Sequence, residues 1–168
     1  MNKGDKMLKY KLNKGIVDNE IFKEFQEQRG VSLFNHSANS CSIDDFLSVA
    51  YVLCPDIVEV NGYIFISDFF DEKEENSLDK LKILEKQFNY DKTQIEQWVN
   101  SQSLGDFFIG KYTKSLDNDK MIDEFAKVLV YYWSRRAKEL FPDRNIVVEV
   151  GNEIMGELGL TITMYEKI

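Results

Sequence analysis

The most reactive side chains of the chain lie close together, just before a predicted helix. His36 is the only histidine, and Cys41 follows it nearby. A cysteine at a helix N-terminus can act as a nucleophile, because the helix dipole favours the thiolate and a neighbouring histidine can serve as base. Alternatively, Cys41 packs as a small apolar residue on Phe46, and His36 is a polar loop residue. We favour this alternative, because the sequence supplies no third residue to orient the base.

The patterns that bind metals or phosphates do not occur in the sequence. Zinc sites use several Cys and His ligands at set spacings, whereas this chain has two Cys and one His. The acidic run at residues 71–75 lacks the glycine and the ligand order of a calcium loop. The glycines of residues 151–159 match neither phosphate-binding pattern. We therefore predict no metal and no cofactor.

Arg136 lies on the apolar face of the longest predicted helix. At about 100° per residue, it falls near the middle of an arc that also holds Trp133 and Leu140. A guanidinium in that position must reach solvent or pair with a carboxylate, and we predict Glu59 or Glu149 as its partner. A structural ion pair is the simpler interpretation. The other is an arginine in a cleft that binds an anionic ligand or a partner's carboxylate.

Acidic and aromatic residues indicate a binding surface. Tyr131 lies on the polar side of the same helix, so we expect it to be exposed. Interfaces favour tyrosine, tryptophan and phenylalanine. Together with Arg136 and Tyr131, the candidate binding residues are the acidic side chains Asp71, Glu72, Glu74 and Glu75.

Helices are predicted at the start of the chain, where they would position His36 and Cys41. One runs from Asp18 to about Arg29, and residues 35–40 form a polar loop. A second begins after Ser42, which forms a capping box with Asp45, and stops before Pro55. Its expected buried stripe consists of Ile43, Phe46, Leu47, Ala50 and Leu53.

Two β-hairpins are predicted. Asn61 and Gly62 separate two apolar runs and indicate a type I′ turn, with Val60 opposite Tyr63. Both faces of this hairpin are apolar, so we expect it to lie centrally in a sheet. The second hairpin is longer and joins residues 146–150 to residues 160–165. In its last strand, alternation places Leu160, Ile162 and Met164 on the core face and Thr161, Thr163 and Tyr165 outside.

Further helices are predicted from Ser77, from Asp91 and from Asp117 or Asn118, the last ending before Pro142. The expected fold is α+β, with an antiparallel sheet built from two hairpins (about 56–68 and 145–166) packed against about five helices. We expect a single domain over residues 1–168, with residues 1–15 as a flexible N-terminal segment.

Composition narrows the class of protein. The chain has 168 residues, 43% of them hydrophobic, and a formal net charge of −8, which argues against disorder and against direct nucleic-acid binding. No apolar run is long enough for a membrane span or a secretory signal. Two cysteines fit a reducing compartment, so we expect a cytoplasmic protein. The excess of lysine over arginine is typical of AT-rich bacterial or phage genomes.

Three functions remain open. We prefer an acidic protein-binding module, such as an immunity-type or antidefence inhibitor, whose partner has a basic surface. The second is a small enzyme or ligand-binding domain that uses a cleft with Arg136 and with Cys41 or His36. The third is a structural homo-oligomer that buries its aromatic residues.

Overall fold

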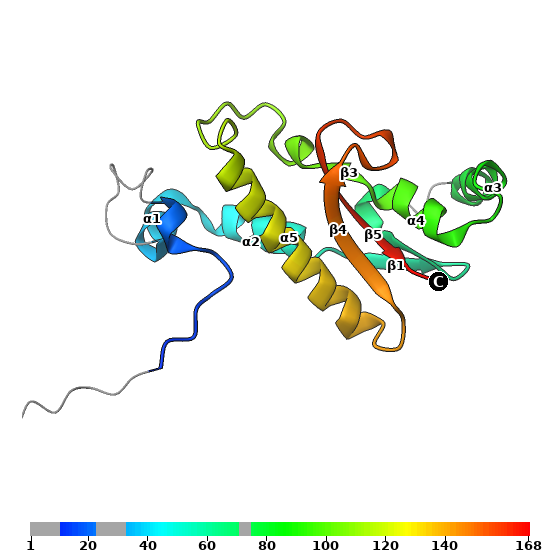
Figure 1. Cartoon of the computed structure of the whole chain (residues 1–168), viewed down its shortest axis with the longest axis horizontal. Coiled ribbons are helices and arrows are strands. Elements are labelled where there is room, and N and C mark those ends of the chain that lie inside the picture. Colours follow the sequence, from blue (N-terminus) through cyan, green and yellow to red (C-terminus); the bar gives the residue numbers. More distant parts are fainter. Residues whose placement is uncertain (1–10, 23–32, 71–74) are drawn as a thin grey trace, which may run out of the picture.

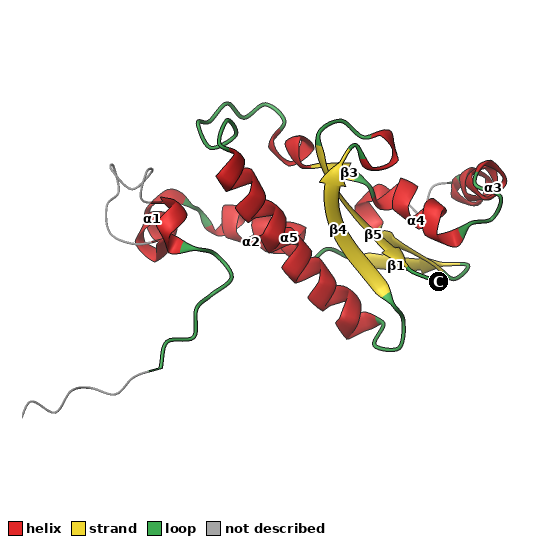
Figure 2. Ribbon diagram, in the orientation of Figure 1, coloured by secondary structure: helices red, strands yellow, loops and turns green. Residues whose placement is uncertain are grey.

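A computed structural model describes residues 11–22, 33–70 and 75–168. Within these residues the fold is α+β, as predicted, with five α-helices and two small antiparallel sheets (Figures 1 and 2). The helices are α1 (Leu33–Ser40), α2 (Ile43–Leu53), α3 (Ser77–Gln87), α4 (Lys92–Asn100) and α5 (Asp119–Leu140). The strands are β1 (Ile57–Val60), β2 (Tyr63–Ile66), β3 (Gln102–Ser103), β4 (Ile146–Asn152) and β5 (Leu160–Glu166).

The N-terminal helices differ from the prediction in two ways. A short 3₁₀ helix (Asn19–Phe22) follows Asp18, and the rest of the first predicted helix lies outside the described residues. Residues 35–40 belong to α1 and are not a loop. The Asn39 side chain donates to the Asn35 carbonyl one turn earlier (2.7 Å). Polar side chains can therefore satisfy backbone carbonyls of a short exposed helix. Such a helix has no apolar periodicity, so the sequence pattern did not predict it.

The predicted ends of α2 are confirmed. Asp45 N–H donates to the Ser42 hydroxyl (3.1 Å), and Ser42 N–H donates to the Asp45 carboxylate (2.8 Å), which completes the capping box. Cys54 is the C-cap, one residue before Pro55. The predicted buried stripe is wrong at Ile43, Phe46, Leu47 and Ala50, which are exposed, whereas Leu53 is partly buried and packs against the core.

The first hairpin has the predicted register, with Val60 paired to Tyr63 and Ile57 to Ile66. Asn61 and Gly62 adopt the positive φ angles that a type I′ turn requires. All four residues of β2 are buried, so both faces of the hairpin are covered as expected. The hairpin is nevertheless a separate two-stranded sheet and is not paired by its backbone to the second sheet.

The second sheet has the order β3-β5-β4, with β5 in the centre. Helix α5 covers one face, where Leu129 and Trp133 pack with Ile162 and Met164 (Figure 1). Helix α4 lies against the other face of β5, and the Thr163 hydroxyl donates to the Gln97 carbonyl (3.2 Å).

This arrangement corrects the predicted outward face of β5. Thr161 and Thr163 are fully buried, and Tyr165 is half-buried. The alternation of apolar and polar residues correctly predicted the face of β5 that packs against α5. Threonine is compatible with a buried strand when its hydroxyl is hydrogen-bonded, so alternation alone does not distinguish a solvated face from one covered by a helix.

Candidate functional site

Helix α2 presents an unusually apolar surface to solvent. Its exposed fractions reach 77% at Ile43, 53% at Phe46 and 64% at Leu47. We call the α2 face the exposed apolar residues of this helix: Ile43, Phe46, Leu47, Val49 and Tyr51. Scattered exposed apolar residues are ordinary, whereas several large ones on one helix are typical of an interaction surface.

Two hydrogen bonds fix the C-terminal end of α2 to the body of the molecule. The indole Nε1–H of Trp133, in α5, donates to the Val52 carbonyl (2.9 Å). The Tyr51 hydroxyl donates to the Asp68 carboxylate (2.7 Å), and this hydrogen bond raises the pKa of Tyr51 to about 12. The helix is thus held at its C-terminal end, where Val52 and Leu53 also pack against the core, while the apolar side chains nearer its start are exposed.

Carboxylates lie at both ends of the α2 face. Asp44 and Asp45 occupy the first turn of the helix. Asp68 bonds Tyr51 at the other end, and Asp56 is near enough to contribute to the raised pKa of that tyrosine. Residues 33–70 contain five acidic residues and no lysine or arginine. The α2 face is therefore apolar with an acidic border.

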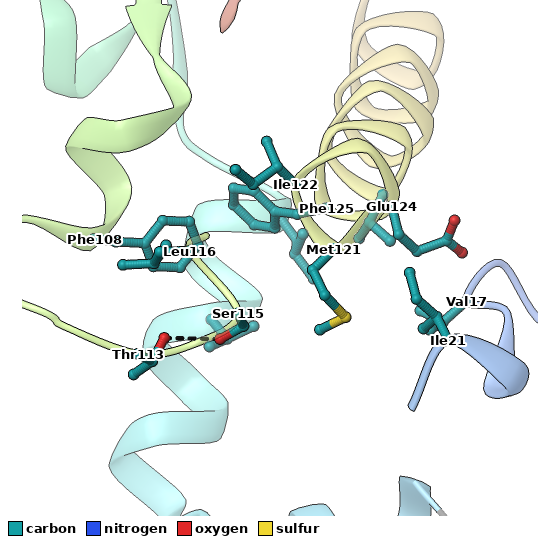
Figure 3. Close-up of a pocket in the computed structure, with 13 residues that line it drawn as sticks. Val17, Ile21, Phe108, Thr113, Ser115, Leu116, Met121, Ile122, Glu124 and Phe125 are labelled. Carbon is teal, nitrogen blue, oxygen red and sulfur yellow. Dashed lines mark hydrogen bonds between the residues drawn. The ribbon is translucent and has the colours of Figure 1, made fainter. Parts of the chain in front are cut away.

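An apolar cavity of about 310 Å³ lies where α2 meets the N-terminal half of α5. Figure 3 shows Met121, Ile122 and Phe125 projecting from α5, with Phe108 and Leu116 contributed by the preceding segment. Val49 and Leu53 line the cavity from α2. The remaining lining residues are Val17, Ile21, Thr113, Ser115, Glu124 and Val128.

The N-terminal segment closes one side of this cavity. Val17 and Ile21 line it, and Asp18 N–H donates to the Glu124 carboxylate (2.8 Å). Glu124 is the only ionisable residue among the described lining residues. Hydrogen bonds from the Lys127 ammonium and from Asp18 N–H lower its pKa, so the wall of an otherwise apolar cavity carries an ionised carboxylate.

The structure places His36 in α1 and Cys41 in the turn between α1 and α2. Cys41 is exposed and free, and its N–H donates to the Ser37 carbonyl (2.9 Å). Within the described part of the chain, no hydrogen bond joins the imidazole to the thiol, and neither residue lines the cavity beside α2. Their proposed catalytic pairing stays a prediction.

Arg136 does not pair with either predicted carboxylate. Its Nη1 donates to Glu139 one turn later on α5 (3.2 Å). Glu59 is bound instead by Arg144 (3.1 Å), and Glu149 lies beside Tyr165. The helical arc correctly placed the Arg136 side chain partly inside, but a periodicity argument cannot choose between carboxylates from distant segments.

Of the candidate aromatic and acidic binding residues, the structure describes Tyr131 and Glu75. Tyr131 is exposed, as predicted. Its ring packs edge-on against that of Tyr132, and the Arg135 guanidinium lies over the Tyr131 ring. Glu75 is exposed in the turn before α3. Asp71, Glu72 and Glu74 lie outside the described residues.

Sequence reasoning missed the most extensive ion cluster of the described residues, which centres on Arg144. Its guanidinium donates to Glu166 through Nη2 (2.7 Å) and Nε (3.1 Å), and to the Gly62 carbonyl (2.8 Å). Lys92 also binds Glu166, and the fully buried Glu96 lies 4.0 Å from Nη2. The cluster joins the first hairpin, α4, β5 and the loop after α5, so its contacts indicate a structural role.

Two polar side chains of α4 connect the two sheets. Asn100 accepts from Ile66 N–H and donates to the carbonyls of Ile64 and Met164, all at 2.8–2.9 Å. Glu96 accepts from the N–H groups of Ile64 and Glu166. These residues are four apart and flank the apolar stripe that Ile95 begins. This four-residue spacing was the signal available in the sequence. Two polar side chains on one side of a helix, next to its apolar stripe, can face the unpaired backbone groups at the edge of a strand.

None of the helices in the described ranges is long and apolar enough to span a bilayer. In those ranges no group of three or more Cys, His, Asp or Glu side chains is placed to hold a metal ion. No protein-family model matches this chain, and neither a curated protein nor a solved structure matches it significantly.

Proposed function

We propose that this chain is a protein-binding module that recognises a partner with a basic surface through the α2 face. The observation that carries the proposal is a strongly apolar helix with no buried residue, bordered by carboxylates at both ends. Apolar contact would supply the affinity, and the acidic border would orient and accelerate the encounter with a cationic partner. An immunity-type or antidefence inhibitor that covers a basic toxin or nuclease is the role that this chemistry supports best.

Affinity capture from the native host tests the proposal with a matched pair of variants. Leu47→Lys places a cation on the α2 face, where the exposed fraction is 64%. Ile83→Lys makes the same change on α3, where the exposed fraction is 63%. We expect the wild type and Ile83→Lys to retain a basic protein in similar amounts. The amount retained by Leu47→Lys should be lower by about tenfold or more. Equal retention on both variants would contradict the proposal.

The inhibitory role has its own readout. The captured partner should be less active in complex with the wild-type chain than when free, and Leu47→Lys should restore its activity at equal concentrations. Circular dichroism of both lysine variants serves as the control, because substitutions at exposed positions should leave the helical signal unchanged.

A further inference from the structure

We infer that the cavity between α2 and α5 is the anchor site of this interface, and that it takes a bulky apolar side chain from a cationic amphipathic helix of the partner. This inference rests on the proposed function and adds the site and the chemistry of the bound segment. Interfaces concentrate their binding energy in a few large side chains that fill pockets, surrounded by weaker contacts.

The cavity is continuous with the α2 face. Val49 belongs to both, since it lines the cavity and is itself 55% exposed. Phe46, Val49 and Leu53 recur at three- and four-residue spacing, so they form one stripe along the helix. A partner helix lying along this stripe would therefore pass from the exposed face directly over the mouth of the cavity, as in helix-in-groove recognition.

The size and the lining of the cavity suit an apolar anchor. Its volume of about 310 Å³ is at the lower limit of small-molecule pockets, which typically span about 300–1,000 Å³. Apart from the rim carboxylate of Glu124 and two hydroxyls, the lining is aliphatic or aromatic. The hydroxyls of Thr113 and Ser115 bond to each other (2.7 Å), which lowers the cost of covering them with an apolar group (Figure 3).

Charge distinguishes a basic partner from a second copy of this chain. A two-fold contact would place the α2 face against itself, and the acidic border of one copy would meet that of the other. Lys111 and Lys114 belong to the loop before α5, and Lys111 is near enough to Asp45 to add to the lowering of the carboxyl pKa that Ser42 hydrogen bonds cause. Residues 33–70 themselves contain five acidic side chains and no lysine or arginine, so the border of the α2 face remains acidic. A partner with lysine or arginine beside its apolar stripe therefore fits best.

A designed peptide tests the inference without knowledge of the natural partner. The probe is a helical leucine–lysine peptide of about 18 residues, with a benzophenone photo-crosslinker replacing one central leucine. Its control is the leucine–glutamate peptide of the same pattern. We expect the leucine–lysine peptide to bind and to crosslink to cavity residues such as Met121, Val49 or Phe125. Crosslinks confined to other surfaces, or equal binding of the leucine–glutamate peptide, would overturn the inference.

Matched variants locate the binding energy. Val49→Arg introduces a cation at the cavity mouth, and Leu78→Arg introduces one on α3 at a similar exposed fraction (52%). Peptide affinity should fall by about tenfold or more for Val49→Arg and by less than about twofold for Leu78→Arg. Equal losses would overturn the inference. Sedimentation showing a wild-type dimer that Val49→Arg dissociates would also overturn it, because a second copy would then occupy the face.

The outcomes separate this inference from the proposed function. If a host protein depends on Leu47 but binds Val49→Arg normally, the module binds a partner and the cavity is not its anchor site. If the leucine–lysine peptide crosslinks in the cavity while no host protein is retained, the cavity binds amphipathic cations and the proposed function fails.

Discussion

At the scale of single residues, Asn100 occupies a position that a neighbouring strand would normally fill. Its carboxamide satisfies Ile66 N–H and the carbonyls of Ile64 and Met164, and Asn100 itself is fully buried. Strand edges carry unpaired donors and acceptors that must find partners when they are buried. One side chain thus joins two sheets that share no backbone ladder.

Removing this carboxamide should destabilise the whole molecule. Asn100→Ala leaves three buried backbone groups without their partners, and each such group costs about 1–3 kcal/mol. We therefore expect the free energy of unfolding in urea to fall by about 3 kcal/mol or more. Asn152→Ala, at an exposed position in β4, is the control and should change it by less than about 0.5 kcal/mol. A loss at Asn100 as small as that of the control would mean that the two sheets are held by other contacts.

Arg144 makes stability depend on pH in a definite direction. Hydrogen bonds from Arg144 and then from Lys92 hold the pKa of Glu166 below its ordinary value of 4.5. That stabilisation is fully present above about pH 4.5 and is lost as the pH falls through the lowered folded-state pKa. Burial raises the pKa of Glu96, so its ionisation costs stability as the pH rises, and the nearby Arg144 partly offsets this cost.

Arg144→Met should therefore be most destabilising near neutral pH. Arg144 and Glu166 are partly buried, so removing the guanidinium should cost up to about 3 kcal/mol, because it leaves carboxylates uncompensated. The difference from the wild type should shrink in two steps as the pH falls. Glu96, whose pKa is raised, takes up its proton above about pH 4.5, and Glu166, whose pKa is lowered, takes up its proton below that pH. Urea unfolding of both proteins, from neutral pH to below about pH 4.5, measures this difference in the free energy of unfolding. Lys82→Met, which breaks an exposed pair with Asp79, is the control, and a pH-independent loss at Arg144 would contradict the electrostatic explanation.

At the scale of elements, α2 and α5 begin in similar ways but differ in their connection to the core. Ser42 caps α2, and Asn118 caps α5 by accepting from the N–H groups of Lys120 and Met121. Helix α5 contributes buried residues such as Leu129 and Trp133, whereas α2 contributes none. Losing a cap should therefore have local consequences in α2 and global consequences in α5.

Ser42→Ala and Asn118→Ala test this difference. Each removes a cap worth about 1 kcal/mol. Hydrogen exchange should show about fivefold faster exchange confined to α2 amides for Ser42→Ala, with nearly unchanged global unfolding. Asn118→Ala should lower the global free energy of unfolding by about 1 kcal/mol. A global loss of the same size for Ser42→Ala would show that α2 unfolds together with the core.

The predictability of these elements follows from the range of the interactions that create them. Ser42, Asn61 and Gly62 act within a few residues, so the α2 start and the first hairpin were predictable from the sequence. The apolar stripe of α2 was also visible, but periodicity identifies an amphipathic helix without identifying what covers it. The Arg144 cluster and the cavity depend on segments that are distant along the chain. No local pattern specifies those contacts.

At the scale of the whole molecule, part of the negative net charge of −8 lies around the α2 face. Carboxylates border the α2 face, and Lys111, on the loop before α5, is near enough to Asp45 to contribute to the lowering of its pKa. A charged border acts mainly on the encounter of two proteins and on their orientation, while the apolar contact controls how long they remain together. The two contributions should be separable by kinetics.

Binding to the captured partner should show that separation. Between about 0.05 M and 0.5 M salt, the association rate constant should fall by about tenfold, because salt screens the attraction between the acidic border and a basic partner. Asp44→Asn should lower the association rate constant at low salt, whereas Phe46→Ser should mainly raise the dissociation rate constant. Surface plasmon resonance measures both constants. Asp79→Asn on α3 is the charge-matched control, and equal effects of Asp44→Asn and Asp79→Asn would assign the salt dependence to overall charge, against an oriented border at α2.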